Sequence, residues 1–136
     1  MNFALDSSFA LTWVLADEAS DQTDRALDSL GTGSKAFVPA LWRWEISNAL
    51  LSAERQKRAA HAEIAGHLHY LQSLPIEVDE ACLEQAWNAT HWLAQRHKLT
   101  SYDAAYLELS IRRGLPLASQ DDRLREAAKA EGVRLL

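Results

Sequence analysis

The sequence predicts an α/β fold in which helices cover both faces of a parallel, doubly wound sheet. Three observations support this prediction. Short apolar runs lack polar alternation, as strands buried on both faces do. Longer segments repeat apolar residues at helical spacing, and the two kinds of segment alternate along all 136 residues. A chain of this length is expected to form one domain, residues 1–136, which buries roughly 70% of its unfolded surface.

The first predicted strand is the apolar run at residues 2–5, which leads directly into Asp6. Ser7 or Ser8 can then cap a helix, because a serine hydroxyl accepts hydrogen bonds from the free amides of a first helical turn. An acidic stretch at residues 17–21 interrupts the apolar pattern before a second short helix. The inward face of that helix is expected to consist of Ala26, Leu27 and Leu30.

A turn at residues 31–34, Gly-Thr-Gly-Ser, separates this helix from the second strand, residues 36–38. Pro39 ends the strand because it has no amide hydrogen to donate to a neighbouring strand. Residues 41–56 and residues 61–73 both carry apolar side chains at helical spacing. We therefore expect two helices that form a hairpin.

The third strand is predicted at residues 75–78, with Asp79 after it as the cap of one long helix. The inward side chains of that helix are expected to be Leu83, Ala86, Thr90 and Leu93. Another helix is predicted to begin near Thr100 and to end at Gly114, since glycine readily ends a helix.

The last part of the chain repeats the pattern. Residues 115–118 form a weak fourth strand, residues 119–122 its exit loop, and residues 122–131 a final helix. Residues 133–136 are expected to complete the sheet, which would then have five strands.

Charge and cysteine content limit the kinds of protein that this chain can be. Nineteen acidic and fourteen basic residues give a formal net charge of −5, which argues against a protein that coats nucleic acid through charge. A nuclease remains possible, since an acidic metal site carries negative charge of its own. The single cysteine, Cys82, cannot form an internal disulfide and is expected to be a core residue. Without a membrane-length apolar run or a basic secretion signal, the protein is expected to be cytoplasmic, with no membrane partner.

Acidic side chains recur where the predicted elements change type, on the side of the fold where the strands end. They are Asp6, Glu45, Asp103, Asp121 and Asp122. Most of them have an ordinary explanation when taken singly. Asp103 can complete a capping box with Thr100. Asp121 or Asp122 can cap the last helix, and Glu45 can be a solvated helix residue.

Asp6 is harder to explain in this way. A carboxylate directly after a buried strand needs partners that offset its desolvation, and no neighbour of Asp6 is basic. Carboxylates that converge repel one another, which favours raised proton affinity or bound cations. A set of oxygen ligands selects Mg²⁺ or Mn²⁺, and a recurring use of carboxylate-held Mg²⁺ is phosphodiester hydrolysis.

Motifs of other catalytic strategies are absent from the sequence. There is no Gly-x-Ser-x-Gly elbow and no paired cysteine and histidine, which argues against a nucleophilic side chain. There is also no glycine-rich phosphate loop, which argues against ATPases and dinucleotide-binding enzymes.

Four segments together resemble the PIN domain family, and within it the VapC-type toxins of bacterial toxin–antitoxin pairs. The resemblance lies in their order and spacing and covers essentially the whole chain. The segments are LDSS at 5–8, PALWRWEISNAL at 39–50, LTSYDAAY at 99–106 and LASQD at 117–121.

The resemblance implies a three-layer α/β/α fold with a five-stranded parallel sheet, and Mg²⁺- or Mn²⁺-dependent endoribonuclease activity. The catalytic acids of the family correspond here to Asp6, Glu45, Asp103 and Asp121. We expect Asp6, Asp103 and Asp121 to hold the metal, with Glu45 completing the site or orienting the attacking water. Ser119 matches the small hydroxyl residue that precedes the last acid by two positions, and it is expected to donate a hydrogen bond within the site.

Several polar neighbours are expected to support these acids. Asn48 lies one helical turn after Glu45 and shares its face. Ser7 suits either a helix cap or a polar neighbour of the site. Asp121 and Asp122 are adjacent, so one can bind metal while the other caps the helix, and the spacing from Ser119 favours Asp121 as the ligand.

The resemblance further implies three partners: an RNA substrate, a small cognate antitoxin that covers the site, and a second copy of the chain in a homodimer. Arg123 and Arg125 are candidate phosphate contacts, because they lie beside Asp121 in the sequence. The chain also has five tryptophans. Trp13, Trp42 and Trp44 can pack in the core, line a groove for an antitoxin helix, or stack on bases.

Three other hypotheses were compared with this one. A phosphoacceptor receiver domain requires paired acids after the first strand and a later lysine, which are not clear here. A haloacid-dehalogenase-type phosphatase requires a second aspartate where Ser8 stands. A catalytically inactive PIN-like module that binds RNA or protein is the remaining alternative, although such a module has no reason to keep four acids at these places.

Overall fold

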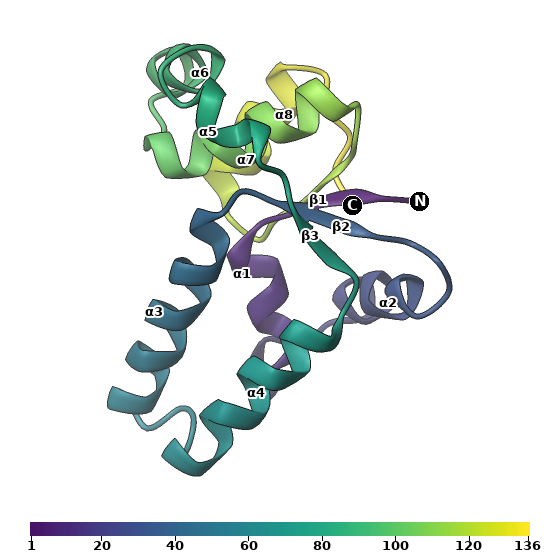
Figure 1. The fold of residues 1–136 in the computed structure, drawn as a ribbon, viewed down its shortest axis with the longest axis vertical. Helices are drawn as coiled ribbons and strands as arrows, with labels where there is room; N and C mark the ends of the chain where they lie inside the picture. Colours follow the sequence, from purple (N-terminus) through teal and green to yellow (C-terminus); the bar gives the residue numbers. More distant parts are fainter.

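A central sheet lies between two groups of helices in the computed structural model, which describes residues 1–136 (Figure 1). The four strands are parallel and lie in the order β3-β2-β1-β4. Their bounds are Phe3–Leu5 for β1, Ala36–Val38 for β2, Ile76–Val78 for β3 and Leu117–Ala118 for β4. The predicted α/β class and the parallel sheet are confirmed.

The prediction of five strands was wrong. Residues 133–136 do approach β4, where the Leu117 amide donates to Arg134 and the Leu136 amide donates to Leu117. This contact amounts to one isolated parallel bridge, between Leu117 and Leu135. β4 is only two residues long, and Pro116 before it has no amide hydrogen to donate. The edge of β4 is therefore too short for a fifth strand to form beside it.

Strand β1 is the centre of the sheet and explains the first apolar run. Phe3, Ala4 and Leu5 are fully buried, since β2 and β4 flank the strand and helices cover both faces. The strand runs from the N-terminus towards α1 and α3 (Figure 1), so its carboxyl end lies near the start of α3. Asp6 follows β1 at this end, in extended conformation at the N-cap position of α1.

One face of the sheet carries the helices α1 (Ser7–Ala10), α2 (Asp21–Leu30), α3 (Leu41–Arg55) and α4 (His61–Ser73) (Figure 1). Two short 3₁₀ turns, η1 (Leu11–Trp13) and η2 (Ala16–Glu18), connect α1 to α2. The predicted hairpin of α3 and α4 is confirmed almost to the residue. The expected cap of the first helix was displaced by one position, because Asp6 occupies the N-cap.

The other face carries α5 (Ala81–Gln85), α6 (Ala89–His97), α7 (Ser101–Arg113) and α8 (Asp122–Ala130) (Figure 1). Helix α7 is the central one, because residues 104–110 are all buried between the sheet and its neighbouring helices. It ends at Gly114, whose φ of 66° lies in the left-handed region that glycine adopts without strain.

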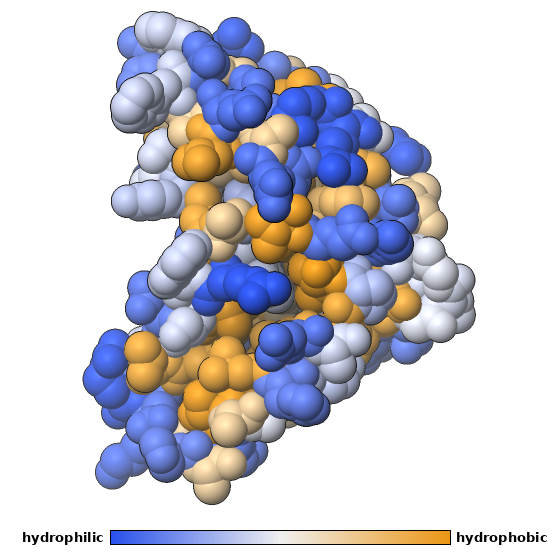
Figure 2. Space-filling view, viewed as in Figure 1, coloured by the Kyte–Doolittle hydropathy of each residue, from blue (hydrophilic) through white to orange (hydrophobic).

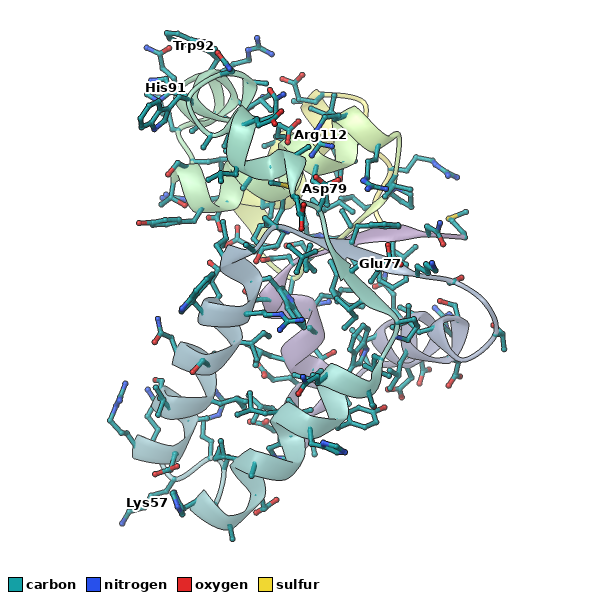
Figure 3. The ribbon with its side chains drawn as sticks, in the orientation of Figure 1. Lys57, Glu77, Asp79, His91, Trp92 and Arg112 are labelled. Atoms are coloured by element: carbon teal, nitrogen blue, oxygen red, sulfur yellow. The ribbon has the colours of Figure 1, made fainter.

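The long helix predicted after Asp79 is two helices, α5 and α6, separated at residues 86–88. Asp79 does not cap it. The Asp79 side chain is buried and accepts hydrogen bonds from Arg112 and Arg113 of α7 instead (Figure 3). Leu83, predicted to face inward, is 84% exposed. Residues 83 and 93 belong to different helices, so the break at residues 86–88 changes which side chains face the core.

Cys82 is buried in α5, as expected of a core cysteine. Burial raises the pKa of its thiol to about 12, so the reactive thiolate does not form at neutral pH. None of the helices combines the length and the hydropathy that a membrane span requires.

Candidate active site at the carboxyl ends of the strands

Asp6 is a buried carboxylate at this edge of the sheet, with 4% of its surface exposed. Its Oδ2 atom accepts hydrogen bonds from the hydroxyls of Ser8 at 2.6 Å and Ser119 at 2.7 Å. Its other oxygen, Oδ1, has only a long contact of 3.5 Å with Ser7 Oγ. One oxygen is therefore held firmly, while the other is left available.

The two serine hydroxyls also link β1 to the loop after β4. Ser8 Oγ accepts from the amide of Gln120 at 3.0 Å, and Ser119 Oγ accepts from the amide of Asp121 at 3.0 Å. Each hydroxyl therefore donates to the carboxylate of Asp6 and accepts from a backbone amide of the loop after β4, more than a hundred residues after Asp6. This network fixes the Asp121 backbone beside Asp6.

Glu45 reaches the same edge from the second turn of α3. Its Oε1 atom accepts a hydrogen bond from the hydroxyl of Tyr106, in α7, and another from Ser7 Oγ at 3.3 Å. Ser7 lies between Asp6 and Glu45 and contacts both. The interaction with Tyr106 joins helices from opposite faces of the sheet at its edge.

Asp103 and Asp121 lie in the first turn of α7 and at the N-cap of α8. Thr100 Oγ1 accepts from the Asp103 amide at 3.1 Å, but the reciprocal bond of a capping box is absent. Asp121 does cap α8, since its Oδ1 accepts from the Leu124 amide at 2.9 Å. Capping thus uses one oxygen of Asp121, whereas the Asp103 carboxylate caps no helix.

These acids raise one another's pKa, although burial is the larger cause in each case. Burial raises the pKa of Asp6 above its ordinary value, and the charge of Asp121 adds to the rise, while the bonds from Ser8 and Ser119 lower it. Burial also raises the pKa of Asp103, and the charges of Asp121 and Asp6 contribute. Their mutual repulsion is the physical sign of a shared site.

Glu45 belongs to the same electrostatic group. Burial raises its pKa, and the charges of Asp6 and Asp103 raise it further, against the hydrogen bonds from Tyr106 and Ser7. Burial and the Glu45 carboxylate in turn raise the pKa of Tyr106, so its hydroxyl stays protonated and donates to Glu45. Four carboxylates at the strand ends therefore influence one another in pairs, and none of them forms a salt bridge with a basic side chain.

Comparison with known protein families shows which family this chain belongs to. The family model described as "PIN domain" matches residues 3–130, almost the whole chain. The chain belongs to the PIN domain family. PIN domains are generally nucleases that use divalent metals and bind nucleic acid, which supports a nuclease activity of the hydrolase kind for this protein.

Among solved structures, this PIN domain is similar to the crystal structure of PAE2754 from Pyrobaculum aerophilum. The two sequences are 25% identical, the match covers 93% of this chain and 84% of that chain, and the TM-score is 0.67. A comparison with curated proteins found no match.

The donor set of this PIN domain fits a hard divalent cation. All candidate ligands are carboxylate oxygens, and burial and repulsion raise the pKa of three of the acids, so a cation would relieve the stored repulsion. No three acidic, histidine or cysteine side chains lie close enough together to hold one ion. Mg²⁺ does not require such a cluster, because it keeps several waters and is commonly held through one or two carboxylates.

The other residues predicted for the site lie at different distances from it. Arg125 is near, since its Nη1 donates to the Ser119 carbonyl at 3.1 Å. Asp122 and Arg123 are exposed on α8 and face His97 and Lys98 across a surface hollow. Asn48 is exposed on α3 and makes no hydrogen bond to the acids. The structure brings together Asp6, Ser7, Glu45, Asp103, Ser119 and Asp121.

Sequence reasoning missed two residues of this site, Ser8 and Tyr106. Ser8 was considered only as a helix cap, although its hydroxyl is the closest donor to Asp6. Tyr106 was assigned no role, although it lies three residues after Asp103 and shares its face of α7. That spacing was the one pattern that could have identified it.

Proposed function

We propose that this PIN domain is a Mg²⁺- or Mn²⁺-dependent endoribonuclease of the VapC toxin type. The observation that carries the proposal is the group of four carboxylates at the strand ends, three of them with a raised pKa and none with a basic partner. Such a group is costly unless a cation binds there. The family membership supports the nuclease class.

In this proposal, Asp6, Asp103 and Asp121 hold the cation, directly or through water. When bound, the cation would lower the pKa of a water, neutralise the phosphate and stabilise the leaving oxygen. Ser8 and Ser119 fix one oxygen of Asp6, so that Oδ1 would be the oxygen available to the cation. Glu45, held by Tyr106 and Ser7, orients the attacking water and accepts its proton.

The VapC resemblance also supports an antitoxin and a second copy of the chain as partners. A cavity of about 170 Å³ opens between α3, α4 and the edge strand β3, and seven of its nine lining residues are hydrophobic. Figure 2 shows apolar side chains gathered over this hairpin. An apolar segment of an antitoxin would bury this surface.

The test is cleavage of total cellular RNA by the purified protein without partners. With Mg²⁺ or Mn²⁺ we expect discrete fragments, and with a chelator none. Folded protein that binds RNA but produces no fragments under any metal condition would favour the alternative, a catalytically inactive RNA- or protein-binding module.

Tyr106→Phe tests the role of the hydroxyl that donates to Glu45. The hydrogen bond lowers the pKa of Glu45, so its loss should raise that pKa further and move the acid limb of the cleavage profile to higher pH. Cleavage at neutral pH should fall several-fold. Tyr70→Phe is the matched control, because Tyr70 is 40% exposed on α4. Superimposable pH profiles for Tyr106→Phe and wild type would contradict the assignment.

A further inference from the structure

Two large aromatic side chains are exposed next to the candidate acids. Trp44 directly precedes Glu45 in α3 and is 69% exposed, and Tyr102 directly precedes Asp103 in α7 and is 63% exposed. Single exposed apolar residues are common on protein surfaces. Here, however, two of them stand beside two of the four acids.

The contacts of α7 place Tyr102 on the side of the site. Tyr102 lies one helical turn before Tyr106, so the two share a face of α7. Tyr106 donates to Glu45 of α3, which shows that this face is directed towards the start of α3. Trp44 belongs to that part of α3. Both exposed rings therefore belong to the helices that this contact joins, and Trp44 and Tyr102 are called the rim residues below.

The surface near this contact is hollowed. In Figure 2 the outline of the molecule is notched between the α3–α4 hairpin and the half that carries α5 to α7. The carboxyl end of β1 points to the same side in Figure 1. An RNA strand that lies in this notch would pass Trp44 and Tyr102 and reach the acids.

Charge alone provides little affinity for a polyanion at this place. The protein carries a net charge of −5, and the site itself is acidic. Arg125, the cation that contacts the site loop, already donates to the Ser119 carbonyl. Stacking of bases on aromatic rings supplies affinity that does not depend on cations, and it tolerates any base sequence.

We propose that Trp44 and Tyr102 are the base-stacking residues of the site and hold unpaired nucleotides on either side of the phosphate to be cleaved. This inference rests on the proposed ribonuclease function and assigns two substrate-binding residues to it. Bases can stack on protein rings only when they are free of a duplex, so an unstructured RNA is the probe that tests the assignment.

The test measures binding and cleavage separately. Binding of an unstructured, fluorescently labelled RNA oligonucleotide is measured in the Asp6→Asn background, where cleavage is removed. Trp44→Ala and Tyr102→Ala should each weaken binding roughly 5- to 100-fold. Trp44→Phe and Tyr102→Phe, which keep a ring, should stay within about threefold of the parent. A duplex of the same sequence should bind more weakly to the parent protein.

Trp92→Ala is the matched control. Trp92 is 57% exposed, and its ring packs edge-on against His91 at 5.0 Å between centroids. Figure 3 shows both residues on α6, at the end of the molecule away from α3. This variant should bind RNA as the parent does. Equal losses in Trp92→Ala and the rim variants, or no loss in the rim variants, would overturn the inference.

The outcomes separate this inference from the proposed function. If the wild-type protein cleaves RNA with metal but the rim variants bind and cleave normally, the inference fails and the function stands. If no cleavage occurs but RNA binding depends on Trp44 and Tyr102, the ribonuclease proposal fails and the stacking surface stands.

Discussion

Asp6→Asn is expected to lower the proposed metal-dependent RNA cleavage on the order of a hundredfold or more, since loss of a proposed metal ligand removes several kcal/mol of transition-state stabilisation. Asparagine has the shape of aspartate, and its amide oxygen still accepts from Ser8 and Ser119. The fold should therefore remain intact. Single-turnover cleavage, with circular dichroism as the check of folding, measures both effects.

The same substitution should raise the melting temperature of the metal-free protein. Burial raises the pKa of Asp6, so its ionised form destabilises the folded state at neutral pH, and the penalty disappears as the pH falls through the folded pKa. The neutral amide removes that penalty at every pH. The gain in melting temperature should therefore be largest near neutrality and should shrink on acidification.

Asp122→Asn is the control for Asp6→Asn. Asp122 is the exposed neighbour of Asp121 in the first turn of α8. Cleavage and melting temperature should both stay close to those of the wild type. Full cleavage by Asp6→Asn, or a melting temperature several degrees below that of the wild type, would contradict the account of Asp6.

Asp79→Ala is expected to cost about 2–3 kcal/mol of unfolding free energy, since it breaks a buried ion pair. The Asp79 side chain is 2% exposed and accepts from Arg112 at 3.0 and 3.1 Å and from Arg113 (Figure 3). The interaction ties the end of β3 to the end of α7. The two arginines are partly exposed, so water can offset some of the loss.

The pH dependence provides a second measurement on Asp79. Burial alone would raise its pKa, but the hydrogen bonds and charges of Arg112 and Arg113 outweigh burial and lower the pKa to about 2. Because the folded pKa lies below the ordinary value, the stability from this pair is present above about pH 4 and is lost as the pH falls towards 2. Asp79→Ala should flatten this part of the pH profile of urea unfolding.

Glu77→Ala is the matched control in the same strand. Glu77 pairs with Lys35 at 2.9 Å, but both side chains are about half exposed (Figure 3). Exposed pairs contribute little, so the loss should stay below about 1 kcal/mol. Equal urea midpoints for the two variants would show that the buried pair does not stabilise the fold as described.

The sequence predicted those elements whose patterns are local. The bounds of helices α3 and α4 were predicted nearly to the residue, because their apolar spacing is regular and a turn lies at each end. β1 was recognisable because an apolar run without alternation is typical of a central strand. The strand-end acids were predictable for a related reason, since parallel strands end at one edge of the sheet.

Features that depend on distant residues were not predictable. Asp79 has the sequence context of a helix cap, and nothing nearby reveals that Arg112 lies 33 residues away and pairs with it. Ser8 likewise has the context of a cap, whereas its hydroxyl links Asp6 to the Gln120 amide. The prediction of a fifth strand was wrong for the opposite reason. Its sequence pattern was favourable, but the two-residue β4 offers almost no edge to pair with.

In the proposed mechanism these carboxylates form one divalent-cation site. Mn²⁺ binding by the purified protein, followed by electron paramagnetic resonance of the free ion, tests for that site. We expect binding by the wild type and by Asp122→Asn, and its loss in Asp6→Asn and Asp103→Asn. A wild type that binds no Mn²⁺ at millimolar concentrations, or an Asp103→Asn variant that binds it equally well, would contradict the claim.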